Sequence, residues 1–266
     1  MAFGIIIIGD EILSGRRTDK HLAKIIELLG ERGLSLGWAE YIGDDPLRIT
    51  ATLKRSLDSG DIVFCCGGIG ATPDDHTRQC AAAALGVPLA LHHEAKGLIQ
   101  QRIVEMAEGD PAKANLESAE NLHRLKMGEF PLGAEIIPNP YNKIPGFALR
   151  NPQGGAHYFV PGFPVMAAPM MAWALDTHHS ALFHSVPHLE KAVIVLDGIE
   201  STLTPLMEAI EAEFAGVKVF SLPSVAEGGR RRQIELGVKG TPEQVEHAYS
   251  RMLEGLEALE QEFRPN

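Results

Sequence analysis

Residues 61–78 read DIVFCCGGIGATPDDHTR and predict a strand, a glycine-rich loop and a helix in direct succession. The apolar run at 62–66 favours β-structure and ends at two glycines, which is typical of a strand buried on both faces. The loop at 67–71 contains three glycines. Because glycine allows positive φ and close approach to the backbone, this loop is suited to present N–H groups to an anion.

The helix predicted after this loop begins with an acidic turn. Thr72 has the character of an N-cap, Pro73 suits the first helical position, and Asp75 would complete a capping box. The pattern predicts a helix from Pro73 to about Leu85. One interpretation is a strand-to-helix turn with a good N-cap and no ligand. A single carboxylate is sufficient for such a cap, so this interpretation does not explain the second one, Asp74.

A metal and phosphate site is the other interpretation of the same residues. Asp74 and Asp75 stand where the helix dipole and free N–H groups would otherwise receive a phosphate. A phosphate and two carboxylates share that space only if a cation lies between them, and Mg²⁺ usually binds through one or two carboxylates plus substrate oxygens. The glycines and the two aspartates together therefore favour a metal-supported phosphate site.

The composition narrows the classes of partner. The chain has 266 residues, enough for two domains with separate cores, and a formal net charge of −11. Nucleic acid is therefore not expected as a partner, because phosphate backbones bind basic surfaces. No signal-type leader and no apolar run of about 20 residues occur, which predicts a soluble cytoplasmic protein with no membrane partner. Cys65, Cys66 and Cys80 lack CxxC spacing and are expected to be buried, reduced thiols.

Acidic residues also follow the first predicted strand. Residues 4–8 are rich in isoleucine and predict a central strand of a parallel sheet. Asp10 and Glu11 lie at its carboxyl end, the edge where open α/β sheets bind ligands, although a solvated acidic turn explains them equally well. The apolar patterns up to residue 66 predict a β-α-β-α-β order and hence a doubly wound, mainly parallel sheet.

The middle of the chain predicts additional strands. Residues 145–150 and 157–160 are expected to form a hairpin across a turn at 151–155, and 133–138 to form another strand. Further helices are expected at 98–109, 115–127 and 165–175. The turn at 161–164 leads into the last of these helices and forms a second strand-to-helix junction at a sheet edge.

A smaller α+β domain is predicted to follow. The segment 178–189 contains four histidines, but Pro187 interrupts any helical face, so an interdomain linker is favoured over a metal site. The other histidines are expected at the surface or at helix caps. We expect domains at 1–178 and 190–266, the second with a β-α-β-β-α order.

Five motifs resemble those of the competence/damage-inducible protein A (CinA) family, whose first domain is of the MoaB/Mog molybdopterin-binding type. The motifs are GDEILSG at 9–15, DD at 44–45, GGIGATPDDHT at 67–77, NKIPGF at 142–147 and PGFP at 161–164. The resemblance is detailed over roughly the first two-thirds of the chain and weaker beyond it.

The resemblance implies roles for particular residues. A ligand phosphate would be held by Gly67, Gly68, Gly70, Thr72 and Thr77, with Pro161 and Gly162 on the opposite rim. A divalent metal, Mg²⁺ or else Mn²⁺ or Co²⁺, would be held by Asp10, Asp74 and Asp75. In a catalytic protein, Asp74, Asp75 and Glu11 are the candidate catalytic residues, and Asp10 and His76 are further candidates for the base.

The sequence departs from the family at several positions. Asp19, Lys20 and His21 stand where the family often has Asp-Thr-Asn, and Ala71 stands where proline is common. The sequence ends at Asn266, before the amidase domain of full-length family members, so no amidase activity is expected.

Two functions of different classes remain open. One is a binding module that holds molybdopterin or a nucleotide without turnover. The other is a metal-dependent pyrophosphatase that cleaves a nucleotide diphosphate such as ADP-ribose, with metal and carboxylates assisting attack of water on phosphorus. A pure interaction protein ranks behind both. A homo-oligomer is expected at the family level.

Overall fold

The protein consists of two compact units, residues Met1–Phe183 and His184–Asn266. The structure, a computed structural model, describes residues 1–151, 154–185, 189–224 and 231–266. Parts of the predicted hairpin turn (152–153) and of the predicted linker (186–188) lie outside the described residues. Within the described ranges, no helix combines the length and apolar character that crossing a membrane requires.

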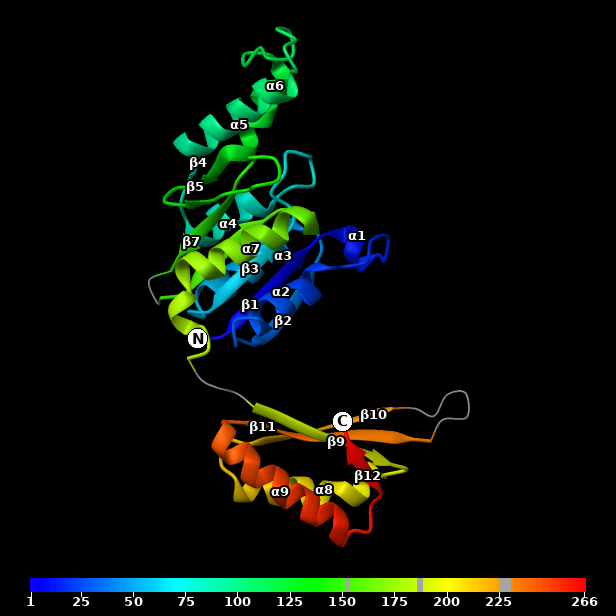
Figure 1. The fold of residues 1–266 in the computed structure, drawn as a ribbon. Coiled ribbons are helices and arrows are strands. Elements are labelled where there is room, and N and C mark those ends of the chain that lie inside the picture. Colours follow the sequence, from blue (N-terminus) through cyan, green and yellow to red (C-terminus); the bar gives the residue numbers. More distant parts are fainter. Residues whose placement is uncertain (152–153, 186–188, 225–230) are drawn as a thin grey trace. The chain divides into compact units, whose positions relative to one another are not determined.

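The first unit is built on a six-stranded sheet in the order β2-β1-β3-β8-β7-β6 (Figure 1). Its strands are β1 (Phe3–Ile8), β2 (Leu36–Ile42), β3 (Ile62–Cys66), β6 (Glu135–Ile137), β7 (Gly146–Arg150) and β8 (Ala156–Val160). The first four strands in this order run parallel, whereas β7 and β6 are antiparallel to their neighbours. The predicted hairpin of β7 and β8 and the mainly parallel sheet are therefore confirmed.

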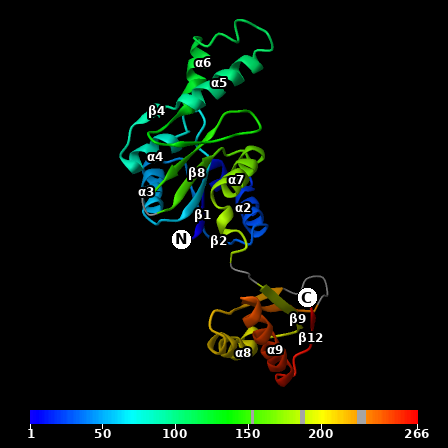
Figure 2. The ribbon, with the colours of Figure 1, turned by 60° about the vertical axis from the view of Figure 1, so that its left-hand side comes forward.

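Helices cover both faces of this sheet (Figure 2). The helices of this unit are α1 (Asp10–Leu13), α2 (His21–Gly30), α3 (Pro46–Leu57), α4 (Thr77–Leu85), α5 (His93–Met106), α6 (Ala119–Leu125) and α7 (Pro164–His178). Of these, α2 and α7 cover one face and α3 and α4 the other. Successive side chains of β1 enter different cores, because strand side chains alternate between the two faces. Ile5 and Ile7 pack with α2 and α7, whereas Ile6 and Ile8 pack with α3 and α4. The doubly wound fold is therefore confirmed.

Two features of the first unit were not predicted. A two-stranded antiparallel sheet joins β4 (Leu89–Leu91) to β5 (Glu129–Pro131). The helix expected at 115–127 is shorter: α6 begins after its N-cap Ser118, and a 3₁₀ turn (Lys126–Gly128) follows it. The Ser118 side chain accepts a hydrogen bond from the backbone N–H of Asn121.

The second unit is an α+β domain with a four-stranded antiparallel sheet in the order β10-β11-β9-β12. Its elements are β9 (Leu189–Leu196), α8 (Glu200–Glu213), β10 (Lys218–Ser224), β11 (Gln233–Gly240), α9 (Pro242–Ala258) and β12 (Phe263–Pro265). One core, formed by β9, β10 and β11 with both helices, stabilises this unit. The predicted β-α-β-β-α order is confirmed, and β12 is an additional short strand.

The expected positions of several histidines were wrong. Helix α7 extends to His178 and a 3₁₀ turn (Ser180–Leu182) follows, so the linker predicted from 178 begins in helical structure. His21 and His157, expected at the surface or at helix caps, are buried, and so is His179 of the predicted linker. The imidazoles of His157 and His179 pair with the hydroxyls of Ser56 and Tyr158, partners that are distant in sequence.

We predict that burial of His157 makes stability depend on pH. Burial lowers the pKa of His157 from its ordinary value of 6.5 to about 4. Between these two values the unfolded chain binds a proton that the folded protein does not, so the free energy of unfolding falls as the pH is lowered, by up to about 1.4 kcal/mol per pH unit. Urea unfolding at pH 7.5, 6 and 5 should show a shallower pH dependence for His157→Gln than for the wild type. Parallel curves for the two proteins would contradict this account.

Candidate functional site

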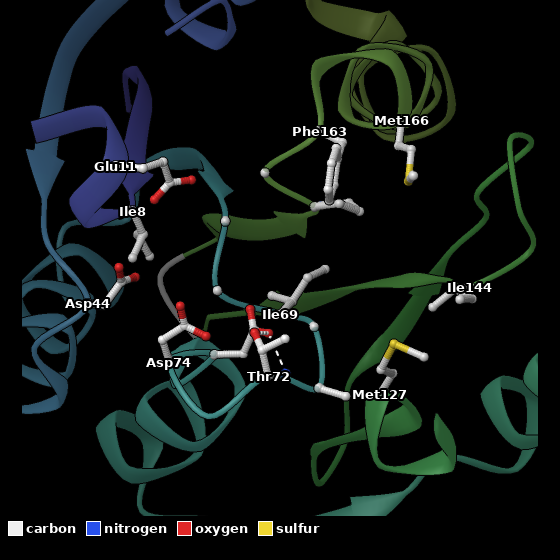
Figure 3. Close-up of a pocket in the computed structure, with 18 of the residues that line it drawn as sticks. Ile8, Glu11, Asp44, Ile69, Thr72, Asp74, Met127, Ile144, Phe163 and Met166 are labelled. Carbon is white, nitrogen blue, oxygen red and sulfur yellow. Dashed lines mark hydrogen bonds between the residues drawn. The ribbon is translucent and has the colours of Figure 1, made fainter. Parts of the chain in front are cut away.

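A cavity of about 530 Å³ lies at the carboxyl ends of the parallel strands in the first unit (Figure 3). The glycine-rich loop after β3 forms one wall, and the turns after β1, β2 and β8 contribute the others. Its lining residues are Ile8, Gly9, Glu11, Arg17, Asp44, Gly67, Gly68, Ile69, Gly70, Ala71, Thr72, Asp74, Asp75, Met127, Asn139, Asn142, Ile144, Pro145, Pro161, Gly162, Phe163 and Met166.

The glycines of the loop are required by its geometry. Gly67 and Gly68 have φ values of 108° and 68°, which L side chains rarely adopt. A Cβ atom on Gly67 would overlap the carbonyl oxygen of Ile8, and one on Gly68 would overlap the hydroxyl of Thr77. The loop therefore follows a path that only glycine permits at these two positions.

The carbonyl groups of this loop are hydrogen-bonded on the side of helix α4. The Thr77 hydroxyl donates to the Gly67 oxygen at 3.0 Å, and the Thr77 N–H donates to the Gly68 oxygen at 2.9 Å. The Arg78 guanidinium donates to the Gly70 oxygen at 2.6 Å. In a trans peptide the N–H points away from the carbonyl, so these bonds direct the following N–H groups to the other side.

Four consecutive backbone donors of the loop are free. Among the residues that the structure describes, the N–H groups of Gly68, Ile69, Gly70 and Ala71 have no hydrogen-bond acceptor. All four residues line the cavity. Successive free N–H groups of this kind form the concave backbone sites at which proteins bind anions.

The helix expected from Pro73 begins instead at Thr77, so that part of the prediction is wrong. Thr72 and Asp75 form a separate turn, in which the Asp75 N–H donates to the Thr72 oxygen at 3.0 Å. The Asp75 carboxylate accepts from the Thr72 N–H at 2.8 Å and from its hydroxyl. Asp75 therefore closes a loop turn, and neither aspartate lies at the first turn of α4.

Besides Asp75, whose carboxylate is bonded to Thr72, three acidic side chains line the cavity: Glu11 from α1, Asp44 from the turn after β2, and Asp74 from the loop (Figure 3). Burial raises the pKa of Asp44, and the charges of Asp10, Glu11 and Asp74 raise it further, against a hydrogen bond from the Asp10 N–H. Polar groups of its own turn, Thr72 and the Asp74 backbone, lower the pKa of the exposed Asp74, while the Thr72 hydroxyl itself donates to Asp75. The cavity thus concentrates negative charge beside free anion-binding donors.

Two of the residues expected at the ligand do not line the cavity. Thr77 is fully buried, and its hydroxyl is bonded to the loop from behind. Asp10 lies in a reciprocal pair with Asp44: the Asp10 N–H donates to Asp44 Oδ2 at 2.8 Å, and the Asp44 N–H donates to Asp10 Oδ1 at 3.3 Å. Thr77 and Asp10 therefore position the loop and Asp44. His76, a candidate base, is the N-cap of α4 and does not line the cavity either, whereas the other predicted site residues do.

The carboxylates fit a cation only together with a ligand. Within the described parts of the chain, no three His, Cys, Asp or Glu side chains are close enough to hold a metal by themselves. Divalent ions such as Mg²⁺ are commonly held by one or two carboxylates and the oxygens of a phosphate. One or two of the carboxylates of Asp74, Asp44 and Glu11 could serve in that second arrangement.

The remaining wall was not identified from the sequence. Met127, Ile144, Phe163 and Met166 give it an apolar surface (Figure 3). Asn139 supports this wall from a buried position, since its amide donates to Asn142 Oδ1 at 2.8 Å and to the Ile144 oxygen at 3.0 Å. Asn142 and Ile144 belong to the NKIPGF motif, so that motif already pointed to part of this wall.

Asp44 belongs to the DD motif at 44–45, but no role at the site was expected for it from the sequence. It follows the carboxyl end of β2, the same position relative to a parallel strand that singled out Asp10 after β1. The topological rule for ligand sites in open α/β sheets therefore applied to both residues.

These features define an α/β protein with a ligand-sized cavity at the carboxyl ends of parallel strands. Residues 4–180 match the family described as "Probable molybdopterin binding domain", which covers most of the first unit. The chain belongs to this family.

Individual relatives agree with this membership and confirm the CinA-like resemblance. A CinA-like protein of Anaeromyxobacter sp. (strain Fw109-5) is 34% identical over 161 residues, 60% of this chain and 37% of that protein. A CinA-like protein of Mycobacterium tuberculosis (strain ATCC 25177 / H37Ra) is 29% identical over 244 residues, 90% of this chain and 55% of that protein. The chain thus spans less than two-thirds of these curated relatives.

A solved structure supports the fold of the first unit. The crystal structure of the protein CinA, of unknown function, from Thermoplasma acidophilum matches with a TM-score of 0.55 and 25% identity. The match covers 66% of this chain and 96% of that one.

We predict that Thr77 acts on the loop rather than on a ligand. Thr77→Val removes the hydroxyl that donates a hydrogen bond to the buried Gly67 oxygen. Because that oxygen would be left without a donor, the free energy of unfolding should fall by about 1 to 2 kcal/mol. Thr50→Val is the matched control, because the Thr50 hydroxyl donates to the accessible Pro46 oxygen, which water can replace. Urea unfolding measures both. Equal, negligible effects of the two substitutions would show that the loop does not depend on Thr77.

Proposed function

We propose that this protein binds a phosphorylated pterin, such as molybdopterin, or a nucleotide through its glycine-rich loop together with a divalent metal ion. One observation carries the proposal: the four loop residues whose N–H groups have no acceptor within the described residues line the same cavity as Glu11, Asp44 and Asp74. Backbone donors alone suit an anion, and carboxylates alone suit a cation. A metal-bound phosphate satisfies both sets of groups at once.

The shape of the cavity supports a ligand that carries a ring system. Its volume of about 530 Å³ falls within the range of about 300 to 1,000 Å³ typical of small-molecule sites. The apolar wall of Met127, Ile144, Phe163 and Met166 lies beside the loop, and such side chains pack against planar rings. The loop is thus suited to the phosphate and the apolar wall to a pterin or a base.

The metal would be held by one or two of the carboxylates of Asp74, Asp44 and Glu11 together with oxygens of the ligand, with Mg²⁺ as the first candidate and Mn²⁺ or Co²⁺ as alternatives. Its chemistry would be to neutralise charge on the phosphate. Asp10 positions Asp44 through their reciprocal hydrogen bonds, and Asp75 fixes the turn that carries Asp74. From the sequence we expected Asp10 and Asp75 to bind the metal directly, whereas here they would position the residues that do.

We predict that Asp74→Asn weakens metal-supported binding without unfolding the protein. Titration calorimetry with ADP-ribose, in Mg²⁺ and in EDTA, measures the affinity. In Mg²⁺ the variant should bind roughly tenfold more weakly or worse, a loss typical of removing one charged partner. Its thermal unfolding should match the wild type, because the Asp74 side chain is exposed.

Asp58→Asn is the matched control for this experiment. Asp58 is an exposed carboxylate at the end of α3 and does not line the cavity, so its substitution should leave the affinity unchanged. If Asp74→Asn binds ADP-ribose in Mg²⁺ as tightly as the wild type does, Asp74 is not a metal ligand. If the wild type binds with the same affinity in Mg²⁺ and in EDTA, binding does not require a metal.

A second function is favoured by the surplus of carboxylates: metal-dependent pyrophosphatase activity on ADP-ribose. Mg²⁺ commonly needs one or two carboxylates, which leaves Glu11 or Asp44 free to act as a base. Water would attack one phosphorus, the bond to the bridging oxygen would break, and the carboxylate would take the proton from water. AMP and ribose 5-phosphate would be the products, and the free N–H groups would stabilise charge on the phosphate.

We predict for this second function that chelator-treated protein releases AMP from ADP-ribose only after Mg²⁺, Mn²⁺ or Co²⁺ is added. Glu11→Gln should retain binding and lose at least about a hundredfold in rate if Glu11 is the base, since general bases contribute about 10² to 10⁴. Asp44→Asn tests the other candidate in the same assay. Tight ADP-ribose binding with no AMP in any of the three metals would leave a binding module without turnover.

We also propose a cytoplasmic location and a homo-oligomeric assembly, with no nucleic-acid partner. The net charge of −11 and three buried free cysteines support the location and the choice of partner. Symmetric homo-oligomers are common among soluble proteins, which supports the assembly.

A further inference from the structure

A second, smaller chamber adjoins the cavity. Its volume is about 70 Å³, and His21, Cys66 and Thr18 contribute to its lining. Five residues line both spaces: Ile8, Glu11, Arg17, Gly162 and Phe163. The two spaces therefore share a wall, and a ligand in the larger one lies next to the smaller one.

His21 is the polar group that distinguishes this chamber. It is the first residue of α2, and it is only 3% exposed. Its Nδ1 lies 2.9 Å from Asp19 Oδ1. Its Nε2 is buried and has no hydrogen-bond partner within the described residues.

The carboxylate of Asp19 fixes the orientation and tautomer of this ring. It accepts hydrogen bonds from the N–H groups of His21 and Leu22, at 2.8 and 3.1 Å, and from the Tyr41 hydroxyl at 2.8 Å. These bonds, against the effect of burial, lower the pKa of Asp19, so it remains a carboxylate and acts only as an acceptor. In the neutral imidazole the proton therefore lies on Nδ1, and Nε2 presents a lone pair.

An unpaired buried nitrogen of this kind is uncommon. Most buried polar side-chain atoms in proteins have a hydrogen-bond partner, and leaving one without a partner costs free energy. No described group donates to His21 Nε2, although Thr18 and Arg17 also line the chamber, and His21 itself is one of the lining residues. A donor that enters the chamber would satisfy it.

We propose that the chamber is a subsite of the larger cavity, in which His21 Nε2 accepts a hydrogen bond from a hydroxyl or ring N–H of the bound ligand. This inference rests on the proposed function and extends it. The chamber is too small for a second nucleotide but has room for a hydroxyl or the edge of a ring. The loop and metal hold any phosphate, whereas His21 selects ligands that carry a donor at the correct distance from it.

The boundary between the two spaces is suited to such an entry. The Arg17 guanidinium lies over the Phe163 ring at 5.9 Å from its centroid, and both side chains are exposed. Exposed side chains change rotamer readily, so this contact can adapt to a ligand without disturbing the sheet. Arg17 and Phe163 thus form the adjustable part of the shared wall.

The test compares three ligands that share a diphosphate: inorganic pyrophosphate, ADP-ribose and 6-hydroxymethylpterin pyrophosphate. Calorimetry in Mg²⁺ gives the affinity of wild-type protein and of His21→Phe, which fills the ring volume without an acceptor. The variant should bind ADP-ribose or the pterin about fivefold to tenfold more weakly, the effect of one hydrogen bond. It should bind pyrophosphate as the wild type does. Whether the nucleotide or the pterin loses affinity identifies the source of the donor.

The controls separate this inference from the proposed function. His179→Phe is the matched variant, because His179 is also buried, does not line either space, and pairs with Tyr158; it should leave all three affinities unchanged. If His21→Phe binds all three ligands as the wild type does, or weakens all three equally, the subsite is excluded while the proposed function stands. If the wild type binds none of the three, the proposed function fails and the subsite with it.

A direct readout needs no substitution. Two-bond ¹H–¹⁵N correlation spectra of the wild type report the Nε2 signal of His21. That signal should shift on addition of the ligand that carries the donor and stay in place with pyrophosphate. An Nε2 signal that no ligand moves, in a protein saturated with each, would overturn the subsite.

Discussion

The hydrogen bonds that hold the glycine-rich loop from behind are the constraint on which the site depends. Thr77 and Arg78 bind the carbonyl oxygens of Gly67, Gly68 and Gly70. Peptide planarity then turns the following N–H groups away from α4. Glycine is required because the bonded path has positive φ and passes directly over Ile8 and Thr77. The anion-binding character of the loop thus follows from backbone geometry rather than from basic side chains.

The negative charge around the loop is the reason to expect a cation at this site. Glu11, Asp44 and Asp74 face the cavity, and their mutual repulsion helps to raise the pKa of Asp44. These carboxylates would also repel a phosphate bound to the free N–H groups. A divalent ion between them reverses both effects, since it attracts the carboxylates and the phosphate together. Under the proposed function, the acidic chain would bind an anionic ligand through metal and backbone donors.

The sequence revealed the features that rest on local pattern and missed those that rest on distant partners. The apolar runs of β1 and β3 and the glycines after β3 were sufficient to place the loop at the sheet edge. The predicted start of α4 was wrong because Thr72 and Asp75 can bond to each other either in a helix cap or in a separate loop turn. The bonds of Thr77 to the loop place the start of the helix at Thr77. His157 was expected at the surface because its partner, Ser56, is 101 residues away.

The central claim is that metal and phosphate bind this cavity together. The most direct measurement is the affinity of chelator-treated protein for inorganic pyrophosphate, titrated at several Mg²⁺ concentrations, and the reverse titration of Mg²⁺ with and without pyrophosphate. We predict that Mg²⁺ tightens the binding of pyrophosphate and that pyrophosphate tightens the binding of Mg²⁺, beyond their association in solution. Thermodynamic linkage requires the two factors to be equal. Pyrophosphate affinity that is unchanged or lowered by Mg²⁺ would contradict the central claim.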